Sequence, residues 1–307
     1  MRLRVVALWS VLIFICLGFG LAFMETQQQL SPVSKTTDLY EVIESRKAQY
    51  EWKPEDARID SVWKKTPGIE GREVDVDASY KKMKKKGKFD PKLLVYKSIK
   101  PERSMEDLDP SPIYRGNPKK EMVAFLVNVS WGEEYLPGML KTLADKQVKA
   151  NFFIDGAFAE KFTDHVQMIE EQGHLIGSHG YKHKDMGRMS KEQAKLNLEQ
   201  ADDLLFALTK TKIEYFAPPA GSYNQGTVEA AHDMGMETIL WTVDTVDWKK
   251  PTTDVLIERV MGKLHNGATI LMHPTQVTEK SLPALIDAIR QEGYRIGTLP
   301  TLLSEER

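Results

Sequence analysis

Cysteine is almost absent from the 307-residue chain, which contains only Cys16. A single cysteine excludes an intramolecular disulfide and any metal cluster built on several thiolates. Neither sign of charge dominates: the formal net charge is -2, so we expect no bulk attraction for nucleic acid and no nucleic-acid partner. Hydrophobic residues make up 41% and charged residues 28%, a balance typical of a folded globular protein.

Long apolar runs are equally scarce, and the only strongly apolar segment is Val5 to Phe23. At about 19 residues, it approaches the length that spans a hydrocarbon core. Two arginines precede it, so the positive-inside tendency predicts a cytoplasmic start and an exported body. No clean cleavage site ends the segment, and the small residues of a lipoprotein signal are missing around Cys16. Residues 1–24 are therefore predicted to be a single-pass signal anchor in the cell membrane, with cleavage and secretion as the alternative.

The first third of the chain is predicted to be a small module after a linker. Residues 25–37 are rich in Gln, Ser, Thr and Pro, which indicates the linker. Residues 38–100 are predicted to be a small α/β module to which we attach no chemistry. Its expected elements are helices over 38–50 and 54–65 and strands over 72–77 and 93–99. The basic run over 81–88 could bind anionic wall polymer or lipid headgroups, but a solvated helix face explains it as well.

Residues 101–118 contain several prolines and are predicted to be a second linker. Beyond them, short apolar strands alternate with amphipathic helices, and the clearest helix covers 190–208 behind a capping box of Ser190 and Gln193. The expected strands cover 122–128, 150–154, 174–177, 214–217, 237–242, 268–272 and 295–297. Seven such repeats predict an α/β fold over 119–307, a parallel barrel with one unit fewer than the eightfold form.

Two histidines, His179 and His183, stand where the strand over 174–177 ends and its loop begins. Imidazoles four residues apart can reach one metal ion, and zinc is the usual occupant of such a pair. The spacing alone is weak, because two surface or hydrogen-bonded histidines would produce it as well. In a parallel barrel the strand ends converge on one rim. The residues that follow the other strands therefore indicate whether the histidines form a metal site or are merely exposed or hydrogen-bonded.

Four further clusters follow predicted strands and are expected on the same rim: residues 128–132, 216–223, 241–248 and 270–274. His273 closes a buried strand, and Asp244 and Asp247 lie on a neighbouring loop. A carboxylate that orients an imidazole suits a general acid or base, although a structural histidine fits the pattern too. Trp248 could line the face of a sugar or could pack at the rim.

The order and spacing of these clusters, together with residues 148–156, resemble the polysaccharide deacetylase family, also called carbohydrate esterase family four or the NodB homology domain. The resemblance covers about 119–303. Within the family, the arrangement is similar to that of a sporulation-associated subfamily. It implies a distorted (β/α)7 barrel that hydrolyses the acetamide C–N bond of N-acetylated sugars. In the family, two His and one Asp hold a divalent metal, usually zinc, a second Asp is the base, and a His protonates the leaving amine.

The family roles fall on particular residues of this chain. The resemblance implies metal binding by His179 and His183, acid catalysis by His273 with Asp247 orienting it, and walls of the acetyl pocket at Trp248 and Leu271. The departures are equally specific. The first motif normally ends Asp-Asp-Gly, whereas here Ser130 replaces the base and Trp131 replaces the third metal ligand.

The third motif departs as well, because its Arg and Tyr are replaced by Ala217 and Ala220. The family's Arg normally pairs with the base, so both members of that charge pair are missing together and neither leaves a buried charge behind. The backbone N–H of Ala220 could still donate to an oxyanion, because that donor does not depend on its side chain.

Three functions follow from these observations. The first is an exported metal-dependent deacetylase of cell-wall or spore-wall glycan with a rebuilt site, in which Asp155, Glu133 or Glu134 replaces the missing carboxylate. The second is a catalytically inactive pseudoenzyme that grips peptidoglycan or a similar glycan with Trp131, Trp248 and Tyr223. The third is a membrane-tethered scaffold for another wall protein.

Overall fold

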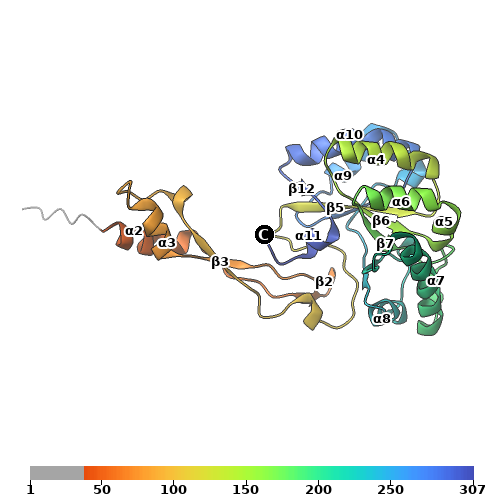
Figure 1. Cartoon of the computed structure of the whole chain (residues 1–307), viewed down its shortest axis with the longest axis horizontal. Coiled ribbons are helices and arrows are strands. Elements are labelled where there is room, and N and C mark those ends of the chain that lie inside the picture. Colours follow the sequence, from red (N-terminus) through yellow and green to blue (C-terminus); the bar gives the residue numbers. More distant parts are fainter. Residues whose placement is uncertain (1–37) are drawn as a thin grey trace, which may run out of the picture. The chain divides into compact units, whose positions relative to one another are not determined.

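The computed structural model describes residues 38–307, and their contacts divide them into two compact units (Figure 1). Among the described residues, the first unit contains 38–47 and 76–94 and the second contains 48–75 and 95–307. The predicted linker over 101–118 therefore does not separate two units, because it belongs to the second. The predicted signal anchor (1–24) and linker (25–37) lie outside the described residues. Within 38–307, no helix is long and apolar enough to cross a membrane.

The first unit contains helices α2 (Leu39–Arg46) and α3 (Val76–Met83). Asp38 caps α2 by accepting a hydrogen bond from the N–H of Tyr40 at 3.2 Å. Ile43 on α2 and Met83 on α3 are completely buried and form the apolar part of this small unit. The basic run over 81–88 begins in the last turn of α3, and its lysines are exposed.

The second unit begins with two antiparallel strand pairs, β1 (Arg58–Asp60) with β2 (Lys64–Thr66) and β3 (Gly71–Val74) with β4 (Tyr96–Ile99). The helix expected over 54–65 is wrong. Asp60 accepts hydrogen bonds from the N–H groups of Val62 and Trp63, which turns the chain into a hairpin. Lys65 of β2 is buried, and its Nζ meets Oε1 of Glu237 at 2.5 Å, a distant partner that local sequence does not reveal.

One parallel sheet organises the rest of the second unit, in the strand order β10-β11-β5-β6-β7-β8-β9, with β12 paired to the start of β5. Its strands are β5 (Met122–Val129), β6 (Asn151–Ile154), β7 (Leu175–Ser178), β8 (Tyr215–Phe216), β9 (Glu237–Thr238), β10 (Val243–Asp244), β11 (Thr269–Met272) and β12 (Arg295–Ile296). Every residue of β5 is buried, as expected for a strand with both faces covered. The predicted α/β class and parallel sheet are confirmed.

Helices lie around the outside of this sheet (Figure 1). They are α4 (Leu136–Asp145), α5 (Gly156–Lys161), α6 (Thr163–Glu171), α7 (Lys191–Thr209), α8 (Gln225–Asp233), α9 (Thr253–Met261), α10 (Gln276–Gln291) and α11 (Leu299–Leu303). Short 3₁₀ turns complete the chain: η1 (Lys47–Gln49), η2 (Pro91–Leu93), η3 (Met105–Asp107), η4 (Glu133–Tyr135), η5 (Met186–Arg188), η6 (Pro219–Gly221) and η7 (Asp247–Lys249). The predicted capping box of Ser190 and Gln193 starts α7, as expected.

The strand expected over 237–242 is wrong beyond residue 238: β9 ends at Thr238 and β10 begins only at Val243. Between them, a segment from the predicted linker pairs with the chain. The N–H of Ile113 donates to the carbonyl of Thr238, and the carbonyl of Ile113 accepts from the N–H of Leu240, both at 2.8 Å. Three residues on, the N–H of Gly116 donates to the carbonyl of Gly267, just before β11. The parallel sheet curves into a half-barrel, and residues 113–116, called the closing segment below, contact both the strand β9 at one end of the strand order and the start of β11 near the other.

Candidate functional site

Seven of the residues predicted for the site meet in one pocket of about 370 Å³ at the carboxyl ends of the strands. We call it the histidine pocket. Predicted residues that line it are His179, His183, His273, Trp131, Trp248, Leu271 and Ala220. They come from the ends of β5, β7 and β11 and from the turns η6 and η7, so the parallel topology brings together positions that lie far apart in the sequence.

His179 lies at the end of β7 and is completely enclosed. Its Nδ1 lies 2.7 Å from the carbonyl oxygen of Ala217, so Nδ1 carries the proton and donates it. The other ring nitrogen, Nε2, is left with a free lone pair, the form that binds a metal or accepts a hydrogen bond. Burial, together with the nearby His183, lowers the pKa of His179 to about 3, which keeps the ring neutral near pH 7.

The loop that carries His183 is held by two buried polar side chains. The N–H of His183 donates to Oδ2 of Asp155 at 2.7 Å, while Oδ1 of Asp155 accepts from the N–H groups of Ala157 and Phe158 at the start of α5. The carboxylate of Asp155 is thus committed on both oxygens to backbone donors and does not line the histidine pocket. The structure thus places Asp155, the suggested replacement for the base, as a helix cap and a loop anchor.

Asn197 of α7 supports the same loop from the other side. Its Oδ1 accepts from the N–H of Tyr181, and its Nδ2 donates to the carbonyl of Tyr181. The loop needs this support because His183 has a left-handed backbone, with φ of 45°. The sequence analysis did not find Asn197, and a lone polar position on the buried face of α7 was the only available signal.

His273 and Asp247 form a buried pair as the resemblance implied. Nδ1 of His273 lies 2.8 Å from Oδ1 of Asp247, while Oδ2 accepts from the backbone N–H of His273 and from the hydroxyl of Thr278. Burial raises the pKa of Asp247, but the hydrogen bonds and positive charge of His273, with the Thr278 hydroxyl, outweigh it and hold the pKa below its ordinary value. Asp247 therefore stays ionised and fixes the ring of His273 with its Nε2 directed away from the pair.

Trp131 covers that histidine. The indole of Trp131 and the imidazole of His273 are stacked, with ring centroids 5.9 Å apart and planes 9° from parallel. The geometry depends on Gly132, whose φ is 82° and where a Cβ would lie only 2.0 Å from the carbonyl oxygen of Pro274. The close approach of residues 132 and 274 thus places the ring of Trp131 beside His273.

The two metal-binding candidates fit a catalytic zinc site poorly. The ring centroids of His179 and His183 lie 5.2 Å apart, so the two imidazoles are neighbours. A catalytic zinc, however, normally has three protein ligands and one open position. Within residues 38–307, no group of three or more His, Cys, Asp or Glu side chains is arranged to hold a metal ion. Where the resemblance expects the third ligand, the chain has Trp131, whose indole cannot coordinate zinc.

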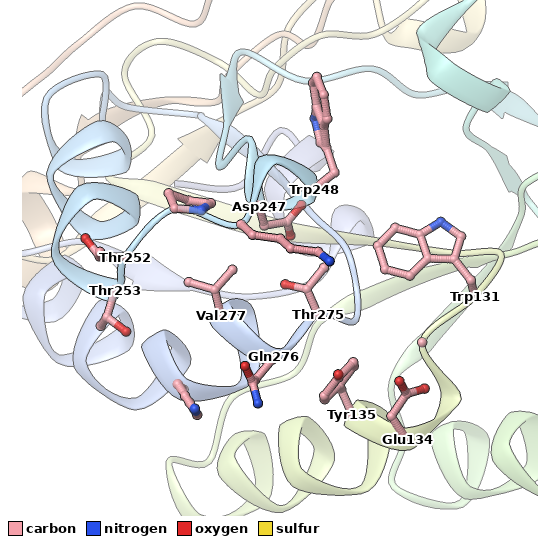
Figure 2. A pocket seen from close by; sticks show the side chains of 14 residues that line it. Trp131, Glu134, Tyr135, Asp247, Trp248, Thr252, Thr253, Thr275, Gln276 and Val277 are labelled. Carbon is pink, nitrogen blue, oxygen red and sulfur yellow. The ribbon is translucent and has the colours of Figure 1, made fainter.

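Other predicted residues lie elsewhere. Tyr223 is not part of the wall of the histidine pocket, and its hydroxyl is hydrogen-bonded to that of Tyr114 at 3.0 Å. Glu133 and Glu134 lie in η4, and Glu134 lines a neighbouring pocket instead (Figure 2). Neither glutamate lines the histidine pocket.

Three further polar residues line the pocket: Asp244, Asn128 and Ser130. Asp244, at the end of β10, is the one carboxylate along its wall, and one of its oxygens accepts from the N–H of Val246 at 2.8 Å. Oδ1 of Asn128 and Oγ of Ser130 are buried without a hydrogen-bond partner in residues 38–307. Ser130 therefore leaves an unpaired hydroxyl where the family has a charged base. The sequence analysis placed Asp244 beside Asp247 on a loop of the rim, and the structure separates their roles: Asp247 pairs with His273, whereas Asp244 lines the pocket.

Comparison with known proteins identifies the family. A family model described as polysaccharide deacetylase matches residues 115–239. The crystal structure of BA3943 from Bacillus anthracis, described as a CE4 family pseudoenzyme, is 44% identical, with a TM-score of 0.83 over 88% of this chain and 96% of that chain. This chain belongs to the polysaccharide deacetylase family. A BA3943 mutant described as having restored enzymatic activity is 43% identical, with a TM-score of 0.83, and covers 88% of this chain and 99% of that chain.

Two further relatives show the range of the family. YlxY, an uncharacterised protein of Bacillus subtilis, is 46% identical over 88% of this chain and 84% of its own length. A peptidoglycan-N-acetylglucosamine deacetylase of Bacillus cereus is 31% identical over 57% of this chain and 66% of its own length. The polysaccharide deacetylases similar to this chain thus include a peptidoglycan enzyme and a protein described as a pseudoenzyme.

Proposed function

We propose that this polysaccharide deacetylase homologue binds N-acetylated cell-wall glycan without hydrolysing it. The observation that carries the proposal is the stacking of Trp131 on His273, at the position where the family has its third metal ligand. A base and a metal are what make water attack an acetamide in this family, and the chain has Ser130 and Trp131 in their places. What remains is a pocket with aromatic walls and neutral or paired polar groups, which suits binding.

Two comparisons support the binding of peptidoglycan and the loss of turnover. The Bacillus cereus relative is named for its action on peptidoglycan, and the BA3943 structure is described as a pseudoenzyme. We propose that the apolar segment over 5–23 tethers the chain to the membrane or exports it, so that the pocket meets the wall or the spore wall. The scaffold role is compatible with a location at the wall, because a tethered protein that binds glycan can also bind another wall protein beside it.

A second candidate function is slow deacetylation with a new base. The observation in its favour is Asp244, whose carboxylate lines the same pocket as His179, His183 and His273. A general base contributes about 10²–10⁴ in rate, so an Asp244→Asn change would abolish any residual activity if this candidate holds. Unchanged acetate release in that variant would remove it.

The test compares the native chain with a variant that restores the family's motif. Ser130→Asp, Trp131→Asp and Ala217→Arg together supply the base, the third metal ligand and the partner of the base. We expect the native chain to bind N-acetylglucosamine oligomers with no acetate released. With zinc supplied, the triple variant should release acetate at least about 100-fold faster than the native chain, the lower end of what a base contributes.

The controls separate binding from turnover. His273→Ala in the triple variant should remove the gained activity, because it deletes the leaving-group acid. Acetate release by the native chain that exceeds that of a His179→Ala, His183→Ala variant would overturn the non-hydrolytic proposal. Absence of any glycan binding would favour the scaffold role alone.

A further inference from the structure

Positive charge is concentrated in the first unit, to which the proposed function gives no role. Its described residues, 38–47 and 76–94, contain nine Lys and Arg against five Asp and Glu. The second unit, 48–75 and 95–307, has the opposite balance, with 30 basic and 38 acidic residues. Such an asymmetry between two parts of one chain is typical of a protein that meets an anionic partner with one part only.

Five lysines supply most of the charge of the first unit, and we call them the lysine patch: Lys81, Lys82, Lys84, Lys85 and Lys88. All five are exposed, and among residues 38–307 none of their amines has an ion-pair or hydrogen-bond partner. The first two lie in the last turn of α3, and the others follow in the turn that leaves the helix. The patch therefore presents five uncompensated charges to solvent within eight consecutive residues.

The acidic groups of the first unit do not neutralise the lysine patch. Asp90 already pairs with Lys86 at 3.3 Å, and Glu44 pairs with Lys47 at 2.5 Å. Asp77 lies in the first turn of α3, whereas the patch begins in the last turn of that helix. The two remaining acids, Asp38 and Glu41, belong to the cap and the first turn of α2. No acid lies within the run over 81–88 itself.

The sequence also places a membrane within reach of this patch. Under the proposed function, the apolar segment over 5–23 tethers the chain, and only the 13 residues of 25–37 separate the predicted anchor from the first unit. A chain of that length spans at most about 45 Å when fully extended, and about 20 Å on average when unrestrained. A short tether gives the second contact a high effective concentration. The first unit would thus meet the membrane surface repeatedly.

From this charge and this tether we infer that the lysine patch docks on a membrane surface that contains anionic phospholipid. Each lysine close to such a surface favours contact about fivefold, and the attraction falls off within a Debye length of about 8 Å. The second unit, with its excess of acidic groups, is not attracted to the same surface. The inference adds a lipid contact to the proposed glycan binding and takes from that proposal only the tether. An anionic wall polymer carries similar charge, but nothing in the chain holds it beside the patch.

The experiment reconstitutes the full-length protein in two kinds of nanodisc. One is made of neutral phosphatidylcholine, and the other of an equal mixture with anionic phosphatidylglycerol. A water-soluble acylating reagent modifies exposed amines, and mass spectrometry gives the rate at each lysine. We expect the lysine patch to react at least about fivefold more slowly on the mixed nanodiscs. Lys210 and Lys263, exposed lysines of the second unit, should react equally on both. High salt should remove the difference, because exposed charges are screened.

Variants assign the protection to the patch. With all five patch lysines changed to Gln, Lys92 remains as an exposed reporter in the same unit. Its amine should be protected on mixed nanodiscs in the native chain and unprotected in this variant. The matched control removes the same charge from exposed positions of the second unit and should keep Lys92 protected; its changes are Lys53→Gln, Lys100→Gln, Lys210→Gln, Lys212→Gln and Lys263→Gln.

The outcomes separate this inference from the proposed function. Equal reaction of the patch on the two nanodiscs, or protection of Lys92 that survives loss of the patch, would overturn the membrane contact. Protection by soluble poly(glycerol phosphate) on neutral nanodiscs, with none from phosphatidylglycerol, would show a wall-polymer site instead. A chain that enters neither nanodisc would contradict the tether alone, and its cosedimentation with vesicles of the two compositions would then decide the inference. The patch variant should bind N-acetylglucosamine oligomers as the native chain does, so loss of glycan binding in both would count only against the proposed function.

Discussion

Trp131 stands where the family resemblance expects a carboxylate metal ligand. Its indole stacks on His273. Under the proposed function, this one position both lacks the metal ligand and covers the leaving-group acid. Beside it, Ser130 keeps a buried hydroxyl without a partner in the described part of the chain. The hydroxyl costs less than an unpaired buried carboxylate would, because the arginine of the third motif is also absent.

The zinc affinity of the site should depend on Trp131. In Trp131→Asp, a third ligand joins His179 and His183, and we expect zinc to bind more tightly than to the native chain. Loss of a group that merely supports a ligand costs about 10–100-fold in metal affinity, so a full ligand should contribute at least about tenfold. Competition with a chelator of known affinity measures the change.

Trp131→Ala is the matched control for that experiment, because it removes the ring without adding a ligand. Its zinc affinity should stay close to that of the native chain. Tight zinc binding by the native chain, at the level of the aspartate variant, would show that two histidines suffice and would contradict the prediction.

The clustering of the site could be predicted because each residue follows a strand. His179, His183, His273 and Trp248 lie in the histidine pocket for that reason. Asp155 follows a strand too, yet it caps α5. An Asp directly before a helix is a capping signal, and that local role could have been weighed against catalysis. The pairing of Tyr223 with Tyr114 was not predictable, because no local pattern brings residues 109 apart together.

At the scale of elements, Asp155 connects the start of α5 to the loop that carries His183. Asp155→Ala removes a helix cap and leaves the N–H of His183 without its acceptor. We expect the free energy of unfolding to fall by about 1–3 kcal/mol, the sum of a lost cap and a lost buried hydrogen bond. Urea denaturation monitored by circular dichroism gives the value.

Asp164→Ala is the comparison for that measurement. Asp164 lies in the first turn of α6 and is exposed, so its removal should cost well under about 1 kcal/mol. An equal loss in both variants would mean that Asp155 contributes only charge near a helix start.

Elements with strong local patterns were predicted well, and those with distant partners were not. The sheet strands were visible as apolar runs, and the start of α7 was visible as a capping box. The helix expected over 54–65 failed because Lys65 is buried against Glu237, so its hairpin depends on a residue far along the chain. The single strand expected over 237–242 failed because the closing segment pairs into it.

At the scale of the whole molecule, the closing segment contradicts the boundary that composition suggested. Proline content predicted a linker over 101–118, but Ile113 is completely buried in an apolar cluster with Ile239, Leu299 and Leu302. Just after the predicted linker, Nζ of Lys120 donates a hydrogen bond to the carbonyl oxygen of Ser304, near the end of the chain, at 2.9 Å. The barrel therefore includes residues that precede the family match.

A fragment of residues 119–307 should consequently be less stable than one of residues 101–307. The shorter fragment lacks Ile113, whose burial alone is worth about 1.5–3 kcal/mol, and lacks the backbone bonds to Thr238, Leu240 and Gly267. We expect a lower urea midpoint or aggregation for it. Equal midpoints would show that the closing segment adds nothing to the stability of the barrel.

Stability should also fall in mild acid because of His174. Its Nδ1 accepts the N–H of Ala150, and burial together with Lys149 lowers its pKa to about 4. Below about pH 6.5 the unfolded chain binds a proton that the folded chain refuses, so unfolding becomes easier as the pH falls toward 4. Between pH 6.5 and 5, the titration of His174 should lower the free energy of unfolding by about 1 kcal/mol.

His174→Asn tests this directly, because the amide oxygen can still accept the N–H of Ala150 but does not titrate. The variant should lose less stability than the native chain between pH 6.5 and 5 in urea denaturation. An identical pH dependence in both proteins would assign the effect to other groups.

The closing segment also bears on the order in which a growing chain can fold. The carbonyl of Tyr114 accepts a hydrogen bond from the hydroxyl of Thr269, which lies 155 residues later. A chain synthesised from its N-terminus carries this segment unpaired until nearly the whole sheet has emerged. Because such distant contacts are slow to form, closure of the barrel should be a late event, reached only after translation has passed β11.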